Sequence, residues 1–195
     1  MQIRHSIIIL IYNQEEFVSK CLESFIIQQK LAYEIIVGDD CSTDNSSNII
    51  NSYCERFPTL IKFYKQPKNL GLYLHLNFLC SKVCGDVISI LGGDDFLSGN
   101  MLEEFNNVIL KNDLNPDSDR FILAANHWIL QKNGKMDVFD NSHVKFKNLF
   151  AERLRYGVSF RDSGLSRKLF DCLEIVDPNL GIIADWFWGF DQIMN

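Results

Sequence analysis

The sequence predicts an α/β fold in which a mostly parallel sheet is flanked by helices, with a smaller antiparallel and helical C-terminal part. Short apolar segments alternate with segments whose apolar residues recur at helical spacing, which is the pattern of repeated β-α-β units. The strand segments are apolar along most of their length, as is typical of strands covered on both faces. Because each β-α-β crossover joins parallel neighbours, we expect most of the sheet to be parallel.

The expected strands of the first half are 6–12, 33–38, 60–64 and 87–91. We expect the first helix to begin at Asn13, a good N-cap, with Glu16 as its partner in a capping box. A polar loop at 41–46 precedes the second helix. Further helices are expected at 72–84 and 101–110, where apolar residues again recur at helical spacing.

The pattern changes after residue 120. A strand is expected at 121–130, and Asn133-Gly134 is a hairpin turn signal from which residues 136–139 return antiparallel. The remaining expected helices are 144–155, 163–173 and 184–194.

Two of the expected strands end in adjacent carboxylates: Asp39-Asp40 after the second strand and Asp94-Asp95 after the fourth. Open α/β sheets bind ligands at the edge where the carboxyl ends of their parallel strands meet. Adjacent carboxylates repel each other, and a hard divalent ion with phosphate oxygens on its far side relieves that repulsion. The alternative is a surface turn in which Asp94 and Asp95 only cap the next helix at Ser98.

Composition narrows the classes of partner. The 195 residues suit one domain, and the formal net charge of −6 argues against a general nucleic-acid binder. Residues 143–168 carry seven basic and two acidic side chains, which favours an anionic acceptor, a peripheral membrane contact or an ordinary solvated helix face. The six cysteines are scattered without a C-x-x-C pair, so we expect a reducing cytoplasm.

Several short motifs follow one another in the order and spacing of one enzyme family. They are the strand that runs into Tyr12-Asn13, the segment Val-Gly-Asp-Asp-Cys-Ser-Thr-Asp at 37–44, Asn-Leu-Gly at 69–71, Gly85-Asp86 leading into Gly-Asp-Asp at 93–95, and Ala-Asp-Trp at 184–186. On these motifs the chain resembles the family 2 glycosyltransferases of the GT-A fold over essentially its whole length.

The resemblance implies a set of nucleotide contacts. Asp40 would hydrogen-bond the base of the nucleotide and Asp94 would contact its ribose. Leu10, Tyr12 and Asn69 would belong to the same nucleotide site.

The resemblance also implies the residues of the reaction itself. Asp95 would coordinate a Mn²⁺ or Mg²⁺ ion that bridges the diphosphate, and Asp185 would be the catalytic base. The chemistry agrees, because a bound divalent ion stabilises the diphosphate leaving group and one base suffices for direct displacement with inversion.

The implied function is an inverting, metal-dependent hexosyltransferase of cell-surface polysaccharide synthesis, in the cytoplasm or at the inner face of the membrane. Residues 1–112 would hold a nucleotide-sugar donor, most simply a UDP-sugar, and residues 120–195 a saccharide or lipid-linked saccharide acceptor. The resemblance implies a further acceptor-binding segment, so we expect this half to be truncated. The alternative is a non-catalytic nucleotide-sugar-binding or scaffolding protein of the same fold. A phosphoacceptor domain is disfavoured, because Asn126-His127 stand where it would need a lysine.

Overall fold

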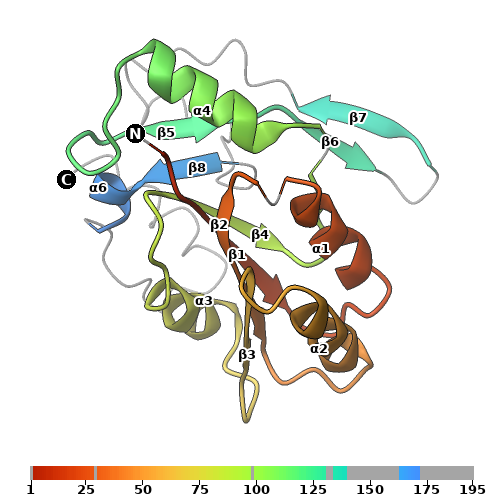
Figure 1. The fold of residues 1–195 in the computed structure, drawn as a ribbon. Coiled ribbons are helices and arrows are strands. Elements are labelled where there is room, and N and C mark those ends of the chain that lie inside the picture. Colours follow the sequence, from red (N-terminus) through yellow and green to blue (C-terminus); the bar gives the residue numbers. More distant parts are fainter. Residues whose placement is uncertain (1, 29, 98, 131–133, 140–162, 172–195) are drawn as a thin grey trace.

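The computed structural model describes all residues except 1, 29, 98, 131–133, 140–162 and 172–195 (Figure 1). Its strands are β1 (His5–Ile11), β2 (Ala32–Asp39), β3 (Ile61–Lys65), β4 (Val87–Gly92), β5 (Ile122–Ala124), β6 (His127–Leu130), β7 (Met136–Phe139) and β8 (Ser163–Ser166). Its helices are α1 (Val18–Ile26), α2 (Ser46–Arg56), α3 (Leu72–Cys80), α4 (Met101–Lys111) and α6 (Arg167–Phe170).

The central sheet has six strands in the order β3-β2-β1-β4-β8-β5. The first four of these are parallel to one another, whereas β8 runs antiparallel to both β4 and β5. A separate antiparallel hairpin is formed by β6 and β7. The predicted α/β class with a mostly parallel sheet and a smaller antiparallel part is therefore confirmed.

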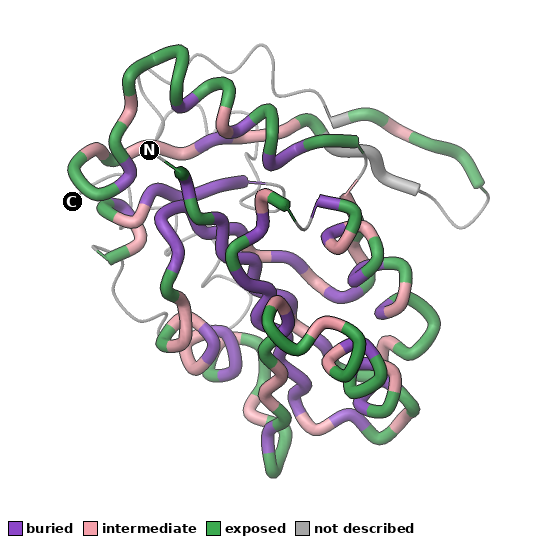
Figure 2. The backbone as a smooth tube through the Cα atoms, in the orientation of Figure 1, coloured by how far each residue is buried: buried purple, intermediate pink, exposed green. Residues whose placement is uncertain are grey.

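Helices cover both faces of the sheet, and the alternation of side chains along β1 explains how. Ile7 and Ile9 belong to the larger core cluster, which packs under α1, α2 and α4, whereas Ile8 belongs to a smaller cluster under α3. Figure 2 shows the central strands as the continuously buried part of the molecule. Strands buried on both faces are mostly apolar, and the apolar run Ile7–Ile11 is why the first strand could be located from sequence.

The register of β1 brings three strand ends to one level. Leu10 pairs with Gly38 of β2 on one side and with Gly92 of β4 on the other, and Ile11 pairs with Asp39. The chain segments that follow β1, β2 and β4 therefore leave the sheet side by side.

The capping-box prediction is wrong. The helix α1 begins only at Val18, and its N-cap residue, Phe17, makes no side-chain capping bond. Asn13 instead has a positive φ of 52°, a conformation that asparagine tolerates better than most residues. The first helix is shorter because residues 12–17 form a loop that bonds to the β2–α2 loop.

The prediction of a helix at 163–173 is also wrong. Residues 163–166 are the strand β8, and only Arg167–Phe170 is helical. A Cβ atom on Gly164 would lie 2.9 Å from Phe105 of α4 and 2.9 Å from Val87 of β4, so the strand fits because this residue has no side chain. Long-range pairing with β4 and β5 overrides the local helical pattern here.

Smaller differences affect two other elements. The helix α3 ends at Cys80, four residues before its expected end, and the strand expected at 121–130 is divided into β5 and β6. The helices expected at 144–155 and 184–194 lie outside the described residues. Within the described part of the chain, no helix has the length and apolar character needed to cross a membrane.

A buried glutamate connects β1, β2 and β3 near the end of the sheet where these parallel strands begin. Glu34 on β2 is 1% exposed, and its carboxylate accepts hydrogen bonds from Ser6 Oγ (2.6 Å), Lys62 Nζ (2.6 Å) and the backbone N–H of Cys84 (2.7 Å). Burial raises the pKa of this carboxyl, but the hydrogen bonds from Lys62, Ser6 and Cys84 outweigh burial and lower the pKa overall. The ionised form is therefore stabilised by folding.

We expect Glu34→Gln to lower the free energy of unfolding at neutral pH by about 1–3 kcal/mol, because the amide leaves the lysine without its charged partner. The carboxylate's contribution is present above its unfolded-state pKa of about 4.3 and is lost as the pH falls through the lower folded-state pKa. Urea unfolding across pH 3–7 should show a flatter acid dependence for Glu34→Gln than for the wild type. The exposed control Glu55→Gln should change stability by less than about 0.5 kcal/mol. Equal acid dependence in Glu34→Gln and wild type would contradict this account.

Candidate functional site

The candidate site lies where β1, β2 and β4 end. Because β1 lies between β2 and β4, one strand separates the pair Asp39-Asp40 from the pair Asp94-Asp95. Two inter-strand spacings are about 10 Å, which is the expected separation of the two pairs along this edge. The structure thus places both predicted acid pairs on one edge, as the sequence predicted.

Asp39 is a structural residue. It is 0% exposed, and its carboxylate accepts the backbone N–H of Ser42 at 2.8 Å and the hydroxyl of Ser47. These bonds fix the turn that carries the chain from β2 into α2.

Asp40 anchors the loop before α3. Its carboxylate accepts the backbone N–H groups of Leu70 (2.7 Å) and Gly71 (2.9 Å), and it is 4% exposed. Asn69 lies in the same loop, is exposed, and accepts the N–H of Gly71 through Oδ1 at 3.0 Å. The structure therefore brings together Asp40 and Asn69, two of the residues predicted to contact the nucleotide.

The loop after β1 is bonded to the loop after β2, a set of contacts that sequence reasoning missed. Asn13 donates its backbone N–H to Ser42 Oγ (2.9 Å) and accepts the N–H of Thr43 through Oδ1 (2.8 Å). Glu15 donates its backbone N–H to Asp44 at 3.0 Å. The signal was present as a run of short polar side chains at 41–46, since such side chains often bond backbone N–H groups of turns.

The other two predicted nucleotide contacts differ in exposure. Tyr12 is 49% exposed at the end of β1 and is available to a ligand. Leu10 is half-buried and packs against the core cluster under α3. Leu10 therefore packs against the protein itself, a role that the predicted nucleotide contact did not include.

Two glycines allow the β4 end to approach its neighbours. A Cβ on Gly93 would collide with Ile11 of β1 and lie 2.5 Å from Gln14 Oε1. A Cβ on Gly92 would lie 2.6 Å from Asp94 Oδ1. The close approach of β4 to β1 therefore depends on the absence of a side chain at Gly93, whereas the contact at Gly92 is with the exposed end of Asp94, which can turn away.

Asp94 and Asp95 are more open than the first pair. Asp94 is exposed and, among the described residues, has no hydrogen-bond partner, while Asp95 is half-buried. Cys21 of α1 lies against this turn, with its Sγ 3.9 Å from the carbonyl oxygen of Gly92. Burial, then the negative charges of Asp95 and Asp94, raise the pKa of the Cys21 thiol to about 12.

This negative field fits a hard divalent cation. Carboxylate oxygens are the ligands that Mg²⁺ and Mn²⁺ prefer, and such ions commonly keep one or two carboxylates with phosphate and water in the remaining positions. In the part of the chain that the structure describes, no group of three His, Cys, Asp or Glu side chains could hold a metal by itself. The donor set therefore fits an ion shared with a phosphate ligand.

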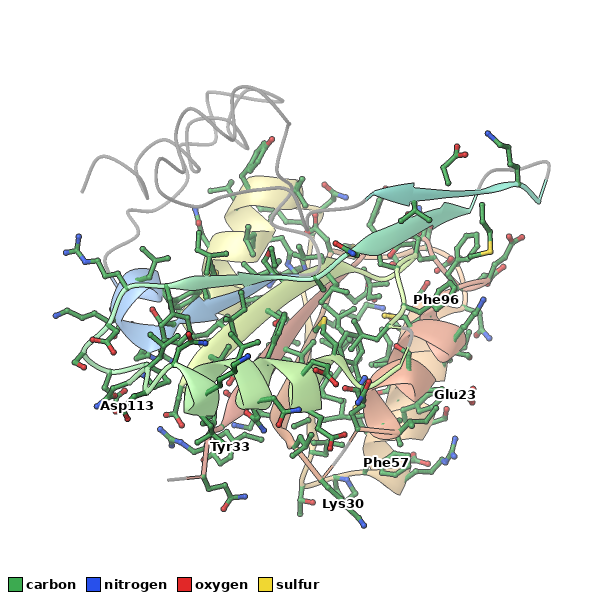
Figure 3. All side chains as sticks on the ribbon, turned by 90° about the horizontal axis from the view of Figure 1, so that it is seen from above. Glu23, Lys30, Tyr33, Phe57, Phe96 and Asp113 are labelled. Atoms are coloured by element: carbon green, nitrogen blue, oxygen red, sulfur yellow. The ribbon has the colours of Figure 1, made fainter. Side chains whose placement is uncertain are left out.

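The segment after the second acid pair is fastened to α1. Phe96, labelled in Figure 3, lies beside this helix, and Lys20 Nζ is 3.6 Å from the centroid of its ring. Leu97 donates its backbone N–H to Ser24 Oγ at 3.0 Å. These contacts hold the turn in place without using the carboxylates.

Some predicted site residues lie outside the described residues, including Asp185 and residues 143–162 of the basic segment. Of that segment, Arg167 is described and has a structural role. Its guanidinium donates to the carbonyl oxygens of Gly85 (2.6 Å) and Val83 (3.3 Å) and pairs with Asp171 (3.0 Å). The guanidinium of Arg167 therefore makes its hydrogen bonds and its ion pair within the protein.

Comparison with known proteins identifies relatives of the chain. The model of the family described as glycosyl transferase family 2 matches residues 6–170. An uncharacterized glycosyltransferase of Haemophilus influenzae is 35% identical over 109 residues, which are 56% of this chain and 43% of that protein. A poly(ribitol-phosphate) beta-glucosyltransferase of Bacillus spizizenii is 31% identical over 109 residues, 55% of this chain and 17% of that protein. The chain thus matches less than half the length of these curated relatives.

Solved structures share the fold. The crystal structure of S. aureus TarS 1–349 has a TM-score of 0.75 at 20% identity, covering 98% of this chain and 56% of that one, and TarS 1–349 is also solved in complex with UDP. A mannosyltransferase of Pyrobaculum calidifontis, solved with GDP-Man and Mn²⁺, has a TM-score of 0.65 at 15% identity, covering 95% of this chain and 50% of that one.

The structural role of Asp39 can be tested directly. We expect Asp39→Ala to lower the free energy of unfolding by about 1–3 kcal/mol, because it leaves a buried N–H and a buried hydroxyl without an acceptor. Urea unfolding measures this loss, and the exposed control Asp117→Ala should stay within about 0.5 kcal/mol of the wild type. Wild-type stability in Asp39→Ala would show that the carboxylate does not fix this turn.

Proposed function

Because the chain belongs to glycosyl transferase family 2, we propose that it is an inverting glycosyltransferase that moves a sugar from a nucleotide-diphosphate sugar to a saccharide or lipid-linked saccharide. The observation that carries the proposal is the shared strand edge with its two acid pairs. One pair is buried and bonded to the protein, whereas the other is open and strongly negative. Such an edge suits a ligand with a polar base at one end and a diphosphate at the other.

The donor is proposed to lie along this edge with its base toward Asp40, Asn69 and Tyr12 and its ribose near Asp94. A UDP-sugar is the favoured donor. Support comes from TarS, whose fold is similar and which has been solved in complex with UDP. The partly buried Leu10 would contribute packing beside the base.

A Mn²⁺ or Mg²⁺ ion held by Asp95 is proposed to stabilise the charge of the departing diphosphate. The fit rests on the exposed and half-buried carboxylates at the β4 end and on the negative field that they create around Cys21. The similar mannosyltransferase structure that contains Mn²⁺ is consistent with this choice of ion.

Asp185 is proposed as the base that removes the proton from the acceptor hydroxyl. One carboxylate within hydrogen-bond reach of the nucleophile suffices for a direct displacement that inverts the anomeric centre. On this proposal residues 1–112 hold the donor, and residues 120–195 face the acceptor. The basic segment 143–168 would contact an anionic acceptor or the membrane surface.

The proposed setting is the cytoplasm, at the inner face of the membrane, in the synthesis of cell-surface polysaccharide. The scattered placement of the six cysteines, without a C-x-x-C pair, supports a reducing compartment. The name of the Bacillus spizizenii relative, a poly(ribitol-phosphate) beta-glucosyltransferase, supports a polymeric acceptor.

The experiment that tests the function is turnover over a panel of UDP-, GDP- and dTDP-sugars with saccharide acceptors. An enzyme releases free nucleoside diphosphate in proportion to sugar transferred. A non-catalytic binding protein of the same fold would bind the nucleotide and release none.

The metal proposal predicts that UDP affinity depends on Mn²⁺ or Mg²⁺. Asp95→Ala should lose at least about tenfold in affinity, the scale on which metal sites lose affinity when their ligands are disturbed. Asp94→Ala should lose less, because its proposed contact is the ribose. Isothermal titration calorimetry with and without chelator measures both effects, with Asp117→Ala as the control. Equal UDP affinity of the wild type in chelator and in Mn²⁺ would overturn the metal assignment.

The base proposal predicts that Asp185→Asn reduces turnover by roughly 10²–10⁴-fold, because general-base catalysis usually supplies that range. Donor affinity should be unchanged, since the amide preserves volume and removes only basicity. Steady-state kinetics together with UDP calorimetry separate the two quantities, and the melting temperature verifies folding. Near-normal turnover by folded Asp185→Asn would assign the base to another residue, with Asp191 as the next candidate.

A further inference from the structure

The helix α1 holds the segment that carries the second acid pair at both of its ends. On one side, Cys21 Sγ lies 3.9 Å from the carbonyl oxygen of Gly92, the residue that opens the turn. On the other side, Ser24 Oγ accepts the backbone N–H of Leu97 at 3.0 Å. Because Cys21 and Ser24 are three residues apart in the helix, they lie on the same face of it. One turn of α1 therefore brackets Asp94-Asp95.

The chain between these two anchors has further fixed points. Asp95 donates its backbone N–H to the carbonyl oxygen of Gly92 at 3.1 Å, which closes the turn, and Gly93 donates its N–H to β1 at 2.9 Å. Phe96 lies beside α1, where Lys20 Nζ is 3.6 Å from the centroid of its ring. The backbone on both sides of Asp95 is therefore fixed by contacts that do not involve its carboxylate.

The hydroxyl group of Ser24 is oriented to accept a hydrogen bond. It donates its own proton to the carbonyl oxygen of Cys21, one turn earlier in α1, at 2.7 Å. Because this proton is used within the helix, the oxygen presents a lone pair to the N–H of Leu97. Alanine at position 24 would remove the acceptor from the N–H of a half-buried residue.

The same face of the helix leads to the start of α4. Gln28, in the turn that follows α1, is 8% exposed and accepts the N–H of Leu102 through Oε1 at 3.0 Å. Residues 21, 24 and 28 have the spacing i, i+3 and i+7, which is that of one helix face. The N-cap residue of α4, Asn100, makes no side-chain capping bond, so Gln28 supplies an acceptor for one of the first N–H groups of this helix.

We propose that Ser24 is a positioning residue of the second acid pair, because its bond to Leu97 holds the turn on which the carboxylate of Asp95 meets the divalent ion. The inference rests on the proposed function and adds to it a residue that acts through the backbone and does not touch the ligand. A carboxylate on a turn that is fixed before the ligand arrives loses less conformational freedom on binding. Preorganisation of this kind raises affinity.

The test is isothermal titration calorimetry of UDP in Mn²⁺ and in chelator. The ratio of the two affinities isolates the metal-dependent contribution, because the proposed contacts of the base at Asp40 are the same in both solutions. Ser24→Ala should lower this ratio about 3- to 10-fold, the effect of losing roughly one hydrogen bond, and should leave UDP affinity in chelator unchanged. Ser24→Thr keeps the hydroxyl group and should restore most of the ratio.

Ser52→Ala is the matched control. Ser52 Oγ donates to the carbonyl oxygen of Ile49 in α2 at 2.7 Å, which is the contact that Ser24 makes with the preceding turn of α1. Ser52 is exposed, and among the described residues its hydroxyl group accepts no N–H from another segment. Ser52→Ala should therefore leave the ratio of UDP affinities unchanged.

Amide hydrogen exchange, followed by NMR on the wild type, tests the bond without a variant. The N–H of Leu97 should be protected in the protein without UDP or Mn²⁺, because its acceptor belongs to α1. In Ser24→Ala this amide should exchange about 3- to 10-fold faster, whereas the N–H of Leu102, which bonds Gln28, should keep its protection.

The outcomes separate this inference from the proposed function. A wild type that binds UDP in neither solution, or equally in both, would overturn the proposed donor and metal site together with this inference. Metal-dependent UDP binding by the wild type with an unchanged ratio in folded Ser24→Ala would overturn the inference alone. So would an equal fall of the ratio in Ser52→Ala, or a Leu97 amide that exchanges as fast as in an unfolded chain.

Discussion

The parallel pairing of β1 with both of its neighbours is the constraint on which the rest of the site depends. Leu10 stands level with Gly38 and Gly92, so the loops that carry Asp40 and Asp94 emerge side by side. A slip of one residue would turn the apolar side chains of β1 toward the wrong helical layer, and burial on both faces resists such a slip. The same packing that stabilises the sheet thus fixes the spacing of the two acid pairs.

The two acid pairs meet the repulsion between adjacent carboxylates in different ways. Asp39 and Asp40 are each supplied with donors by the protein, chiefly backbone N–H groups of the following turn and of the loop at 69–71. Asp94 has no such donor among the described residues, and together with Asp95 it imposes a negative field on its surroundings. The first pair therefore organises loops, whereas the proposed cation would relieve the repulsion within the second.

Sequence reasoning located the features that depend on local pattern and missed those that depend on distant partners. The buried strands and both acid pairs could be predicted, because strands covered on both faces are mostly apolar and acids at their ends are easily recognised. The helical pattern at 163–173 led to the prediction of a helix where β8 lies. This strand forms because it hydrogen-bonds to β4 and β5, which are distant in sequence. The capping box at Asn13 failed because that side chain bonds Thr43, thirty residues further along. The bond between Leu97 and Ser24 depends on packing of the segment after β4 against α1, which no spacing along the chain reveals.

The insertion of β8 between β4 and β5 imposes an order on the assembly of the sheet. Residues 5–92 contain all four parallel strands and emerge first during synthesis. The outer edge of β4 stays unpaired until residues 163–166 have been synthesised. In the described sheet β5 pairs with β8, so β5 cannot join the sheet before β8 does. An unpaired strand edge is a template for pairing with other chains. The nascent protein is therefore most exposed to aggregation between completion of the parallel core and arrival of its last strand.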